Sequence, residues 1–134
     1  MITHLKILTE RQGLQEITKK IMNIVQTSQI NEGLCTLFLR HTSASLLIQE
    51  NADPSAKRDL ENWLNRLVPE GDHLYTHLTE GPDDMPSHIK TMLTASSLSI
   101  PIDKGQLVLG TWQGIYLFEH RRHGSERHLV IHIM

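Results

Sequence analysis

The spacing of the apolar residues changes along this chain, and this change is the feature that most restricts its fold. From residue 98 onward apolar side chains recur at every second position, which is typical of β-strands with one buried face. The alternating positions are Leu98, Ile100 and Ile102, then Leu107, Leu109 and Thr111, and finally Leu129, Ile131 and Ile133. Residues 115–118 predict a further strand after Gly114. Consecutive strands of this kind favour an antiparallel or mixed sheet.

The earlier part of the chain mixes strand patterns with helical spacing. Residues 2–8 and 34–41 predict two strands, and residues 14–27 carry apolar side chains at the spacing of a first helix. Asp53 followed by Pro54 indicates the start of a second helix, which should end before Pro69, and Pro86 marks a third, shorter helix. We therefore expect a single α+β domain, residues 1–134, with a mixed or antiparallel sheet and about three helices.

Composition narrows the classes of partner. With 13 Lys+Arg against 15 Asp+Glu the chain is nearly neutral, so we expect neither a nucleic acid nor a membrane surface as partner. No apolar run approaches the roughly 20 residues that cross a bilayer. The first residues lack a secretory signal, so a cytoplasmic protein is expected. Aromatic residues make up only 4% of the chain, which indicates a modest aliphatic core and favours a homo-oligomer.

The histidines are the first group that could carry chemistry. The chain has nine, and three of them, His41, His77 and His88, stand where a predicted element begins or ends. Three neutral imidazoles with one open position form a usual catalytic zinc site. No two of these three stand at the close spacing of a known metal-binding motif. A shared metal site and three separate hydrogen-bonded histidines therefore both stay open.

Acidic and amide side chains form a second group, in the segments before the second and third helices. Its members are Glu50, Asn51, Asp53, Glu80, Asp83 and Asp84. Carboxylates clustered in loops suit a hard cation such as magnesium, often shared with substrate phosphates. For Asp53 and Asp84, capping and compensation of a helix dipole are favoured over metal ligation. The sequence leaves open a divalent metal, Mg or Zn, without fixing its identity.

A third group is a short basic segment after the strand of residues 115–118. It consists of Glu119, His120, Arg121, Arg122, His123 and Gly124. Guanidinium groups and backbone amides beside glycine bind phosphate or carboxylate, so a small phosphorylated or anionic molecule is the expected partner. A solvated hairpin turn is an equal alternative. The chain lacks a phosphate-binding loop, a dinucleotide-binding fingerprint and a serine-hydrolase elbow.

Four segments resemble the motifs of one family. They are His41-Thr42-Ser43-Ala44-Ser45, Glu50-Asn51-Ala52-Asp53-Pro54, the run from Glu80 through Asp83-Asp84-Met85-Pro86-Ser87-His88 to Lys90, and the stretch from Ser97 through Gly105 to Gly110-Thr111-Trp112-Gln113-Gly114-Ile115. They occur in the family's order and cover most of the chain from His41 onward. The chain is thereby identified as a member of the YjbQ-like family, usually described as secondary thiamine-phosphate synthases.

This resemblance implies an α+β subunit that assembles as a homotrimer, and a transferase that joins hydroxymethylpyrimidine pyrophosphate to thiazole phosphate with release of pyrophosphate. For that reaction we expect catalytic roles for His41, His88, Glu119 and Arg121. We expect substrate contacts from Glu50, Asn51, Asp84, Trp112, Gln113, His120 and Arg122. Two alternatives stay open. One is a non-catalytic trimer that binds a small anion, and the other is a metal-dependent hydrolase with the ligands His41, His77 and His88.

Overall fold

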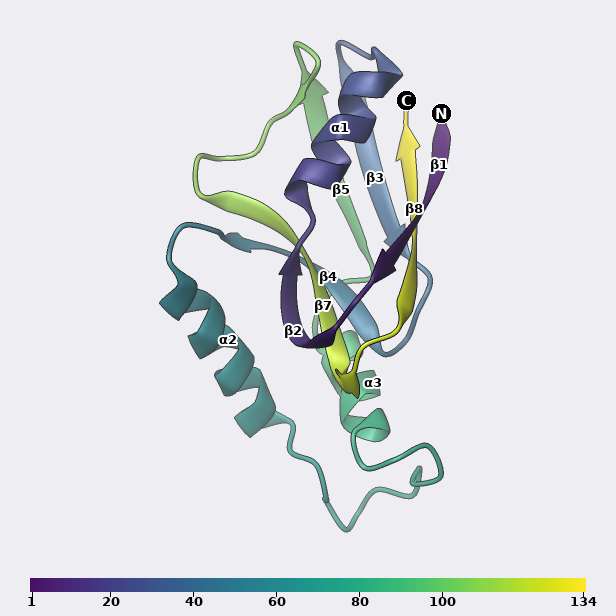
Figure 1. Cartoon of the computed structure of the whole chain (residues 1–134), viewed down its shortest axis with the longest axis vertical. Coiled ribbons are helices and arrows are strands. Elements are labelled where there is room, and N and C mark those ends of the chain that lie inside the picture. Colours follow the sequence, from purple (N-terminus) through teal and green to yellow (C-terminus); the bar gives the residue numbers. More distant parts are fainter.

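The computed structural model describes all 134 residues, which form two antiparallel sheets and three helices (Figure 1). The helices are α1 (Thr18–Ser28), α2 (Pro54–Leu67) and α3 (Asp84–Leu93). The strands are β1 (Ile2–Leu8), β2 (Arg11–Glu16), β3 (Gly33–Leu39), β4 (Ala44–Glu50), β5 (Ser97–Asp103), β6 (Gln106–Leu107), β7 (Gln113–His123) and β8 (Glu126–Ile133). The predicted α+β class is confirmed, and every strand pair is antiparallel.

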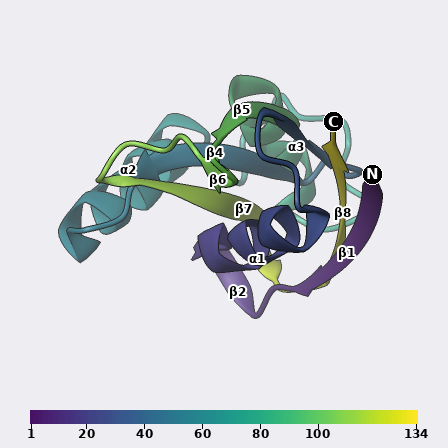
Figure 2. The same cartoon turned by 90° about the horizontal axis from the view of Figure 1, so that it is seen from above.

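The two sheets enclose the main apolar core. The larger sheet has the order β1-β8-β3-β5-β6 and the smaller one has the order β2-β7-β4. Seen from above, β1 and β8 curve along one side of the molecule while β7 and β4 run through its middle (Figure 2). Ile21 of α1, Leu37 of β3, Leu117 of β7 and Ile131 of β8 meet between them with no exposed surface. The apolar residues that alternate with polar ones in the predicted last strand therefore form its buried face.

A second apolar cluster lies on the far side of the smaller sheet, where it meets α2. It contains Leu14, Leu64, Val68, Tyr116 and Phe118, with Ile89 of α3 packed against it. Because both faces of β7 are covered, residues 114–120 are all buried and do not alternate. Helix α2 begins as expected: the carboxylate of Asp53 accepts the N–H of Ser55 at 2.9 Å, and Pro54 follows at the first helical position.

Three segments differ from the sequence prediction. Residues 14–16 belong to β2 instead of the first helix, because Leu14 pairs with Phe118 of β7, and α1 begins only at Thr18. Strand β4 was not predicted. The expected strand of residues 107–111 is confined to β6, and residues 108–112 form a connection to β7.

The pairing of β4 with β7 decides which candidate residues can meet. Ala44 lies opposite Glu119, and Glu50 lies opposite Gln113. The two β7 positions are six residues apart, which corresponds to about 20 Å of strand. The candidate residues are therefore divided between two ends of the smaller sheet, and α3 lies at the Glu119 end.

None of the helices is long and apolar enough to cross a membrane. The cellular location and the exclusion of nucleic-acid and membrane partners stay predictions.

Candidate functional site

Two histidines and one aspartate come together beside α3. The Nε2 atom of His77, in the loop before α3, lies 2.7 Å from Oδ2 of Asp84. The Nε2 atom of His88, one helical turn after Asp84, lies 3.0 Å from the same oxygen. The three ligand atoms lie within 4.8 Å of one another, so this cluster could hold a metal ion.

The backbone fixes the orientation of His88. Its Nδ1 atom lies 2.9 Å from the carbonyl oxygen of Thr42, which can only accept a hydrogen bond. In neutral His88 the proton therefore sits on Nδ1, and Nε2 presents a bare lone pair to the carboxylate of Asp84. Two acceptors face each other unless a second proton or a cation lies between them. Metal-bound histidines commonly show this donation to a backbone carbonyl.

Asp84 is the buried member of the cluster. It is 2% exposed, and its other oxygen, Oδ1, accepts a hydrogen bond from Nη1 of Arg121 at 2.7 Å. Burial opposes ionisation, but the hydrogen bond from His77, further polar contacts and the charge of Arg121 together outweigh it and hold the pKa of the Asp84 carboxyl below its usual value. The carboxylate is therefore ionised at neutral pH and available as a ligand.

Glu80 lies at the open side of this cluster. Its Oε2 atom is 3.9 Å from Nε2 of His77, and its side chain is 63% exposed. In contrast to Asp84, no arginine side chain pairs with its carboxylate. Glu80 is thus an exposed carboxylate beside the cluster that no arginine neutralises.

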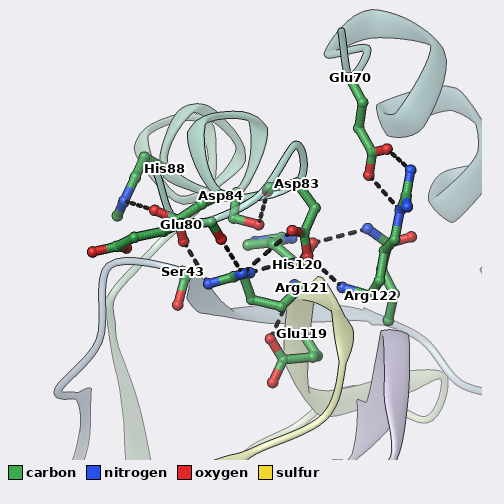
Figure 3. A network of polar contacts seen from close by, with 12 residues as sticks. Ser43, Glu70, Glu80, Asp83, Asp84, His88, Glu119, His120, Arg121 and Arg122 are labelled. Atoms are coloured by element: carbon green, nitrogen blue, oxygen red, sulfur yellow. Dashed lines mark hydrogen bonds and ion pairs between the residues drawn. The ribbon is translucent and has the colours of Figure 1, made fainter. Parts of the chain in front are cut away.

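The two arginines that were expected to bind an anion already have carboxylate partners (Figure 3). Arg121 donates Nε to Asp83 at 3.0 Å, Nη1 to Asp84, and Nη2 to the backbone oxygen of Glu80 at 2.8 Å. Arg122 donates through Nε and Nη2 to both carboxylate oxygens of Glu70. Both arginines therefore tie the loop between α2 and α3 to the end of β7.

His41 and Glu119 belong to a different, buried network. The carboxylate of Glu119, which has no exposed surface, binds Nε of Arg127 at 2.8 Å and Oγ1 of Thr9 at 2.6 Å. Nε2 of His41 accepts the backbone N–H of His128 at 2.8 Å, and its Nδ1 faces Nη1 of Arg127 at 3.2 Å. Burial and the charge of Arg127 lower the pKa of His41. The structure does not place His41 in the cluster of His77 and His88.

His120 points to the opposite face of β7 and is 1% exposed. Its Nε2 atom lies 2.9 Å from Oγ of Ser45, and its Nδ1 atom has no hydrogen-bond partner. Burial, assisted by the charge of Lys90, lowers the pKa of His120 to about 3, so the ring is neutral. Because Ser45 has no exposed surface either, the pair cannot contact a substrate in the present conformation.

The remaining predicted residues gather at the other end of the smaller sheet. The N–H of Asn51 donates to the carbonyl of Trp112 at 3.0 Å, and Glu50 pairs with Gln113. The indole of Trp112 is 63% exposed. Glu50, Asn51, Trp112 and Gln113 are therefore close to one another but remote from the histidine cluster of the same chain.

A polar pocket of about 490 Å³ opens beside the histidine cluster. Its walls are Ser43, Glu80, Gly81, Pro82, Asp83, Arg121, Arg122, His123, Ser125 and Arg127. Sequence reasoning missed Ser43, Ser125 and Arg127, which come from two segments that meet only in the folded chain. It also assigned Asp84 to substrate binding or capping, whereas the structure places it between two imidazoles.

Relatives of this chain carry the same family designation. The sequence profile described as UPF0047 protein YjbQ-like matches residues 3–134. The UPF0047 protein sll1880 of Synechocystis is 50% identical over 129 residues, which cover 96% of this chain and 88% of that protein. The UPF0047 protein YjbQ of Escherichia coli O157:H7 is 43% identical over 127 residues, covering 94% of this chain and 91% of that one.

Solved structures of similar fold lead to the same group. A Clostridium acetobutylicum protein of the yjbq/upf0047 family is 36% identical, with a TM-score of 0.85 over 100% of this chain and 99% of that chain. A YbjQ-like protein of unknown function from Sulfolobus solfataricus is 25% identical, with a TM-score of 0.90 over 99% of this chain and 95% of that one.

These comparisons correct one expectation. The relatives carry only the family designation, the Sulfolobus protein is described as being of unknown function, and none of them is named for thiamine-phosphate synthesis. The prediction of a thiamine-phosphate synthase is therefore wrong. The family resemblance itself is confirmed: this chain belongs to the UPF0047 protein YjbQ-like family.

Proposed function

We propose that this protein is a divalent-metal-dependent enzyme that hydrolyses a small anionic ester, with His77, Asp84 and His88 as the metal ligands. The observation that carries the proposal is the orientation of His88. Its Nδ1 proton is committed to the carbonyl of Thr42, so its Nε2 lone pair and Oδ2 of Asp84 meet at 3.0 Å. A cation between them converts this acceptor–acceptor contact into two favourable bonds.

The ligand atoms favour zinc over magnesium. Magnesium prefers an all-oxygen shell, whereas two imidazoles and one carboxylate are a ligand set found in catalytic zinc sites. The ion pair of Asp84 with Arg121 orients the carboxylate, as the partners of metal ligands commonly do. His41, which was first considered as the third ligand, is replaced in this role by Asp84.

The residues around the cluster suit hydrolysis. A divalent zinc ion lowers the pKa of a coordinated water molecule to about 7. Glu80 has an exposed carboxylate 3.9 Å from His77 Nε2, where it can accept a proton from such a water. The adjacent pocket of about 490 Å³ provides room for the ester.

Metal analysis tests the ligand set. Purified wild-type protein should hold a stoichiometric transition metal, and His88→Ala and Asp84→Asn should both lose it. His73→Ala is the matched control, because His73 is an exposed histidine of the loop that also carries His77. A metal-free wild type that also fails to take up added zinc, or retention of the metal in both ligand variants, would refute the metal site.

A second experiment tests the enzyme. Glu80→Gln should keep the metal but hydrolyse a chromogenic phosphate monoester about 10²- to 10⁴-fold more slowly. Removal of the metal should abolish turnover of the same ester in the wild type, and added zinc should restore it. A metal-loaded protein without measurable turnover of phosphate and carboxylate esters would make it a metal-dependent binding protein instead.

The homotrimer expected from the family resemblance stays part of this proposal. Its support is the outer face of the larger sheet, which no helix covers in Figures 1 and 2. Phe38 on β3 is 50% exposed and pairs with half-buried Val130 of β8, and Leu34 is 40% exposed on the same face. Light scattering should give the mass of three chains. Phe38→Glu should reduce the mass to that of a monomer, and a monomeric wild type would exclude the trimer.

A further inference from the structure

The polar pocket beside the histidine cluster restricts the substrate further. It shares Glu80 and Arg121 with the surroundings of the cluster, and its lining also includes Ser43, which follows the Thr42 that contacts His88, and Ser125 and Arg127. A ligand in this pocket would therefore lie beside the metal ligands and reach the turn that joins β7 to β8. The inference that follows rests on the proposed function, since it names the class of molecule that this site accepts.

Each arginine of the pocket already forms an ion pair with a carboxylate, and Nη1 of the exposed Arg122 is the only guanidinium nitrogen of Arg121 or Arg122 without a protein acceptor. The other donors of Arg121 and Arg122 are directed at Asp83, Asp84 and Glu70, as described above. Arg127 donates Nε to Glu119 and Nη2 to both Glu119 and the carbonyl of Ser43, and it is only 5% exposed. A bidentate contact with phosphate would require breaking one of these ion pairs.

The charges around the pocket also indicate that its arginines are not the main anion-binding groups. Four cations, Arg121, Arg122, Arg127 and Lys90, stand against five carboxylates, which are Glu70, Glu80, Asp83, Asp84 and Glu119. Without a metal the ion pairs of this region therefore leave no excess of positive charge for an anion. A divalent cation at the cluster would supply that excess, so we expect the metal to be the main source of affinity for an anionic group.

The rest of the pocket offers neutral polar groups. The hydroxyl groups of Ser43 and Ser125 have no hydrogen-bond partner within the protein, although the backbone groups of both residues do. Apart from the ring of Pro82, no apolar side chain lines the pocket. Pockets for aromatic or aliphatic ligands are lined mainly by apolar side chains, so this one suits a ligand that carries hydroxyl groups.

We infer that the site takes a small, hydroxyl-rich phosphate ester, such as the phosphate of a short polyol or sugar. The phosphate binds to the metal, and the hydroxyl groups of the ligand bind to the side chains of Ser43 and Ser125. Arg121 and Arg127 hold the protein's own carboxylates in place and do not contact the ligand, whereas the exposed Arg122 can add one hydrogen bond through Nη1.

Calorimetry with phosphonates, which are not hydrolysed, tests this inference. The probes are dihydroxybutylphosphonate, butylphosphonate and benzylphosphonate, each titrated into zinc-loaded and metal-stripped protein whose zinc content is measured. The dihydroxy compound should bind the zinc-loaded protein about 10-fold more tightly than the other two, because each new hydrogen bond contributes about 2- to 10-fold. The stripped protein should bind all three at least about 10-fold more weakly, because it lacks the cation.

Two serine variants complete the test. Ser43→Ala and Ser125→Ala should each reduce the preference for the dihydroxy compound about 2- to 10-fold and leave the affinity for butylphosphonate and for zinc unchanged. Equal binding by stripped and loaded protein, or tighter binding of butyl- or benzylphosphonate, would overturn the inference. Failure of the protein to bind zinc at all would instead overturn the proposed function, and the zinc measurement separates the two outcomes.

Discussion

Glu119 was expected to act in catalysis, but its surroundings predict that it stabilises the fold. Its carboxylate has no exposed surface and accepts hydrogen bonds from Thr9 Oγ1, from two nitrogens of Arg127 and from the backbone N–H of Arg121. Glu119→Gln keeps the shape of the side chain but replaces one acceptor oxygen with an NH2 group that faces donors. It also leaves the guanidinium of Arg127 buried without a counter-charge.

The expected cost follows from that geometry. Removing one partner of a buried ion pair costs about 3 to 5 kcal/mol. For a chain of this length, 1 kcal/mol corresponds to about 3 to 4 °C, so Tm should fall by about 9 to 20 °C. Glu126→Gln is the matched control, because Glu126 pairs with Lys6 while both side chains are more than 60% exposed. That variant should lose less than about 1 kcal/mol.

Urea unfolding at one fixed protein concentration measures both variants, and the fixed concentration removes any effect of oligomerisation. The double variant Glu119→Gln, Arg127→Met should recover part of the loss, because the isolated charge is gone. If Glu119→Gln unfolds with the wild-type free energy while losing catalytic activity, then Glu119 is a catalytic residue and the structural assignment is refuted.

Three further predictions concern metal affinity, pH and packing. Arg121→Met should weaken zinc binding about 10- to 100-fold in a chelator competition, because it releases the carboxylate of Asp84, a proposed metal ligand. Arg122→Met should not weaken zinc binding, and equal effects would contradict this role of Arg121. The pKa of buried His120 is about 3, below its unfolded value of 6.5, so its contribution to stability is complete above pH 6.5 and falls as the pH decreases from there. His120→Phe should therefore flatten the dependence of unfolding free energy on pH between about 5 and 6.5, by up to about 1.4 kcal/mol per pH unit, and an unchanged slope would show that the ring is protonated in the fold. Gly124→Ala places a methyl carbon 1.6 Å from a backbone carbonyl oxygen and should cost at least about 3 kcal/mol in urea unfolding. Gly110→Ala, which meets only a side chain at 3.3 Å, should cost far less, and similar losses would contradict the packing argument.

Parts of the fold could be predicted because their signals are local, either a strand with one buried face or a residue that caps a helix. The last strand alternates between the core and solvent, and the start of α2 carries its own capping residue. Strand β4 could not be predicted, because both of its faces are covered and Ser45 is fully buried against His120 in place of an apolar residue. Leu14 continues the helical spacing of α1 in the sequence, but its pairing with Phe118 of β7 draws it into a strand.

The candidate site, like the fold, could be predicted only in part. His77 and His88 were correctly considered together, and the i, i+4 spacing of Asp84 and His88 on one helix was the signal that could have added the carboxylate. The sequence could not show that His41 lies outside this cluster. Strand β3 ends at Leu39, and Nε2 of His41 accepts the backbone N–H of His128 in β8. The sequence also could not show that both arginines are paired with carboxylates. Glu70 is 52 residues away from its partner Arg122, and Asp83 is 38 residues away from its partner Arg121.

The position of Arg121 changes how variants of this site must be read. Its guanidinium joins Asp83, Asp84 and the backbone of Glu80, so one side chain holds a proposed metal ligand, the proposed base and the loop that carries His77. Loss of activity in an Arg121 variant would therefore look like loss of a substrate contact even if the residue never touches substrate. A true substrate contact would raise KM while zinc content stays constant, whereas a positioning residue should lower zinc affinity and kcat together. Zinc content must accordingly be measured on every variant before any arginine of this pocket is assigned to substrate binding.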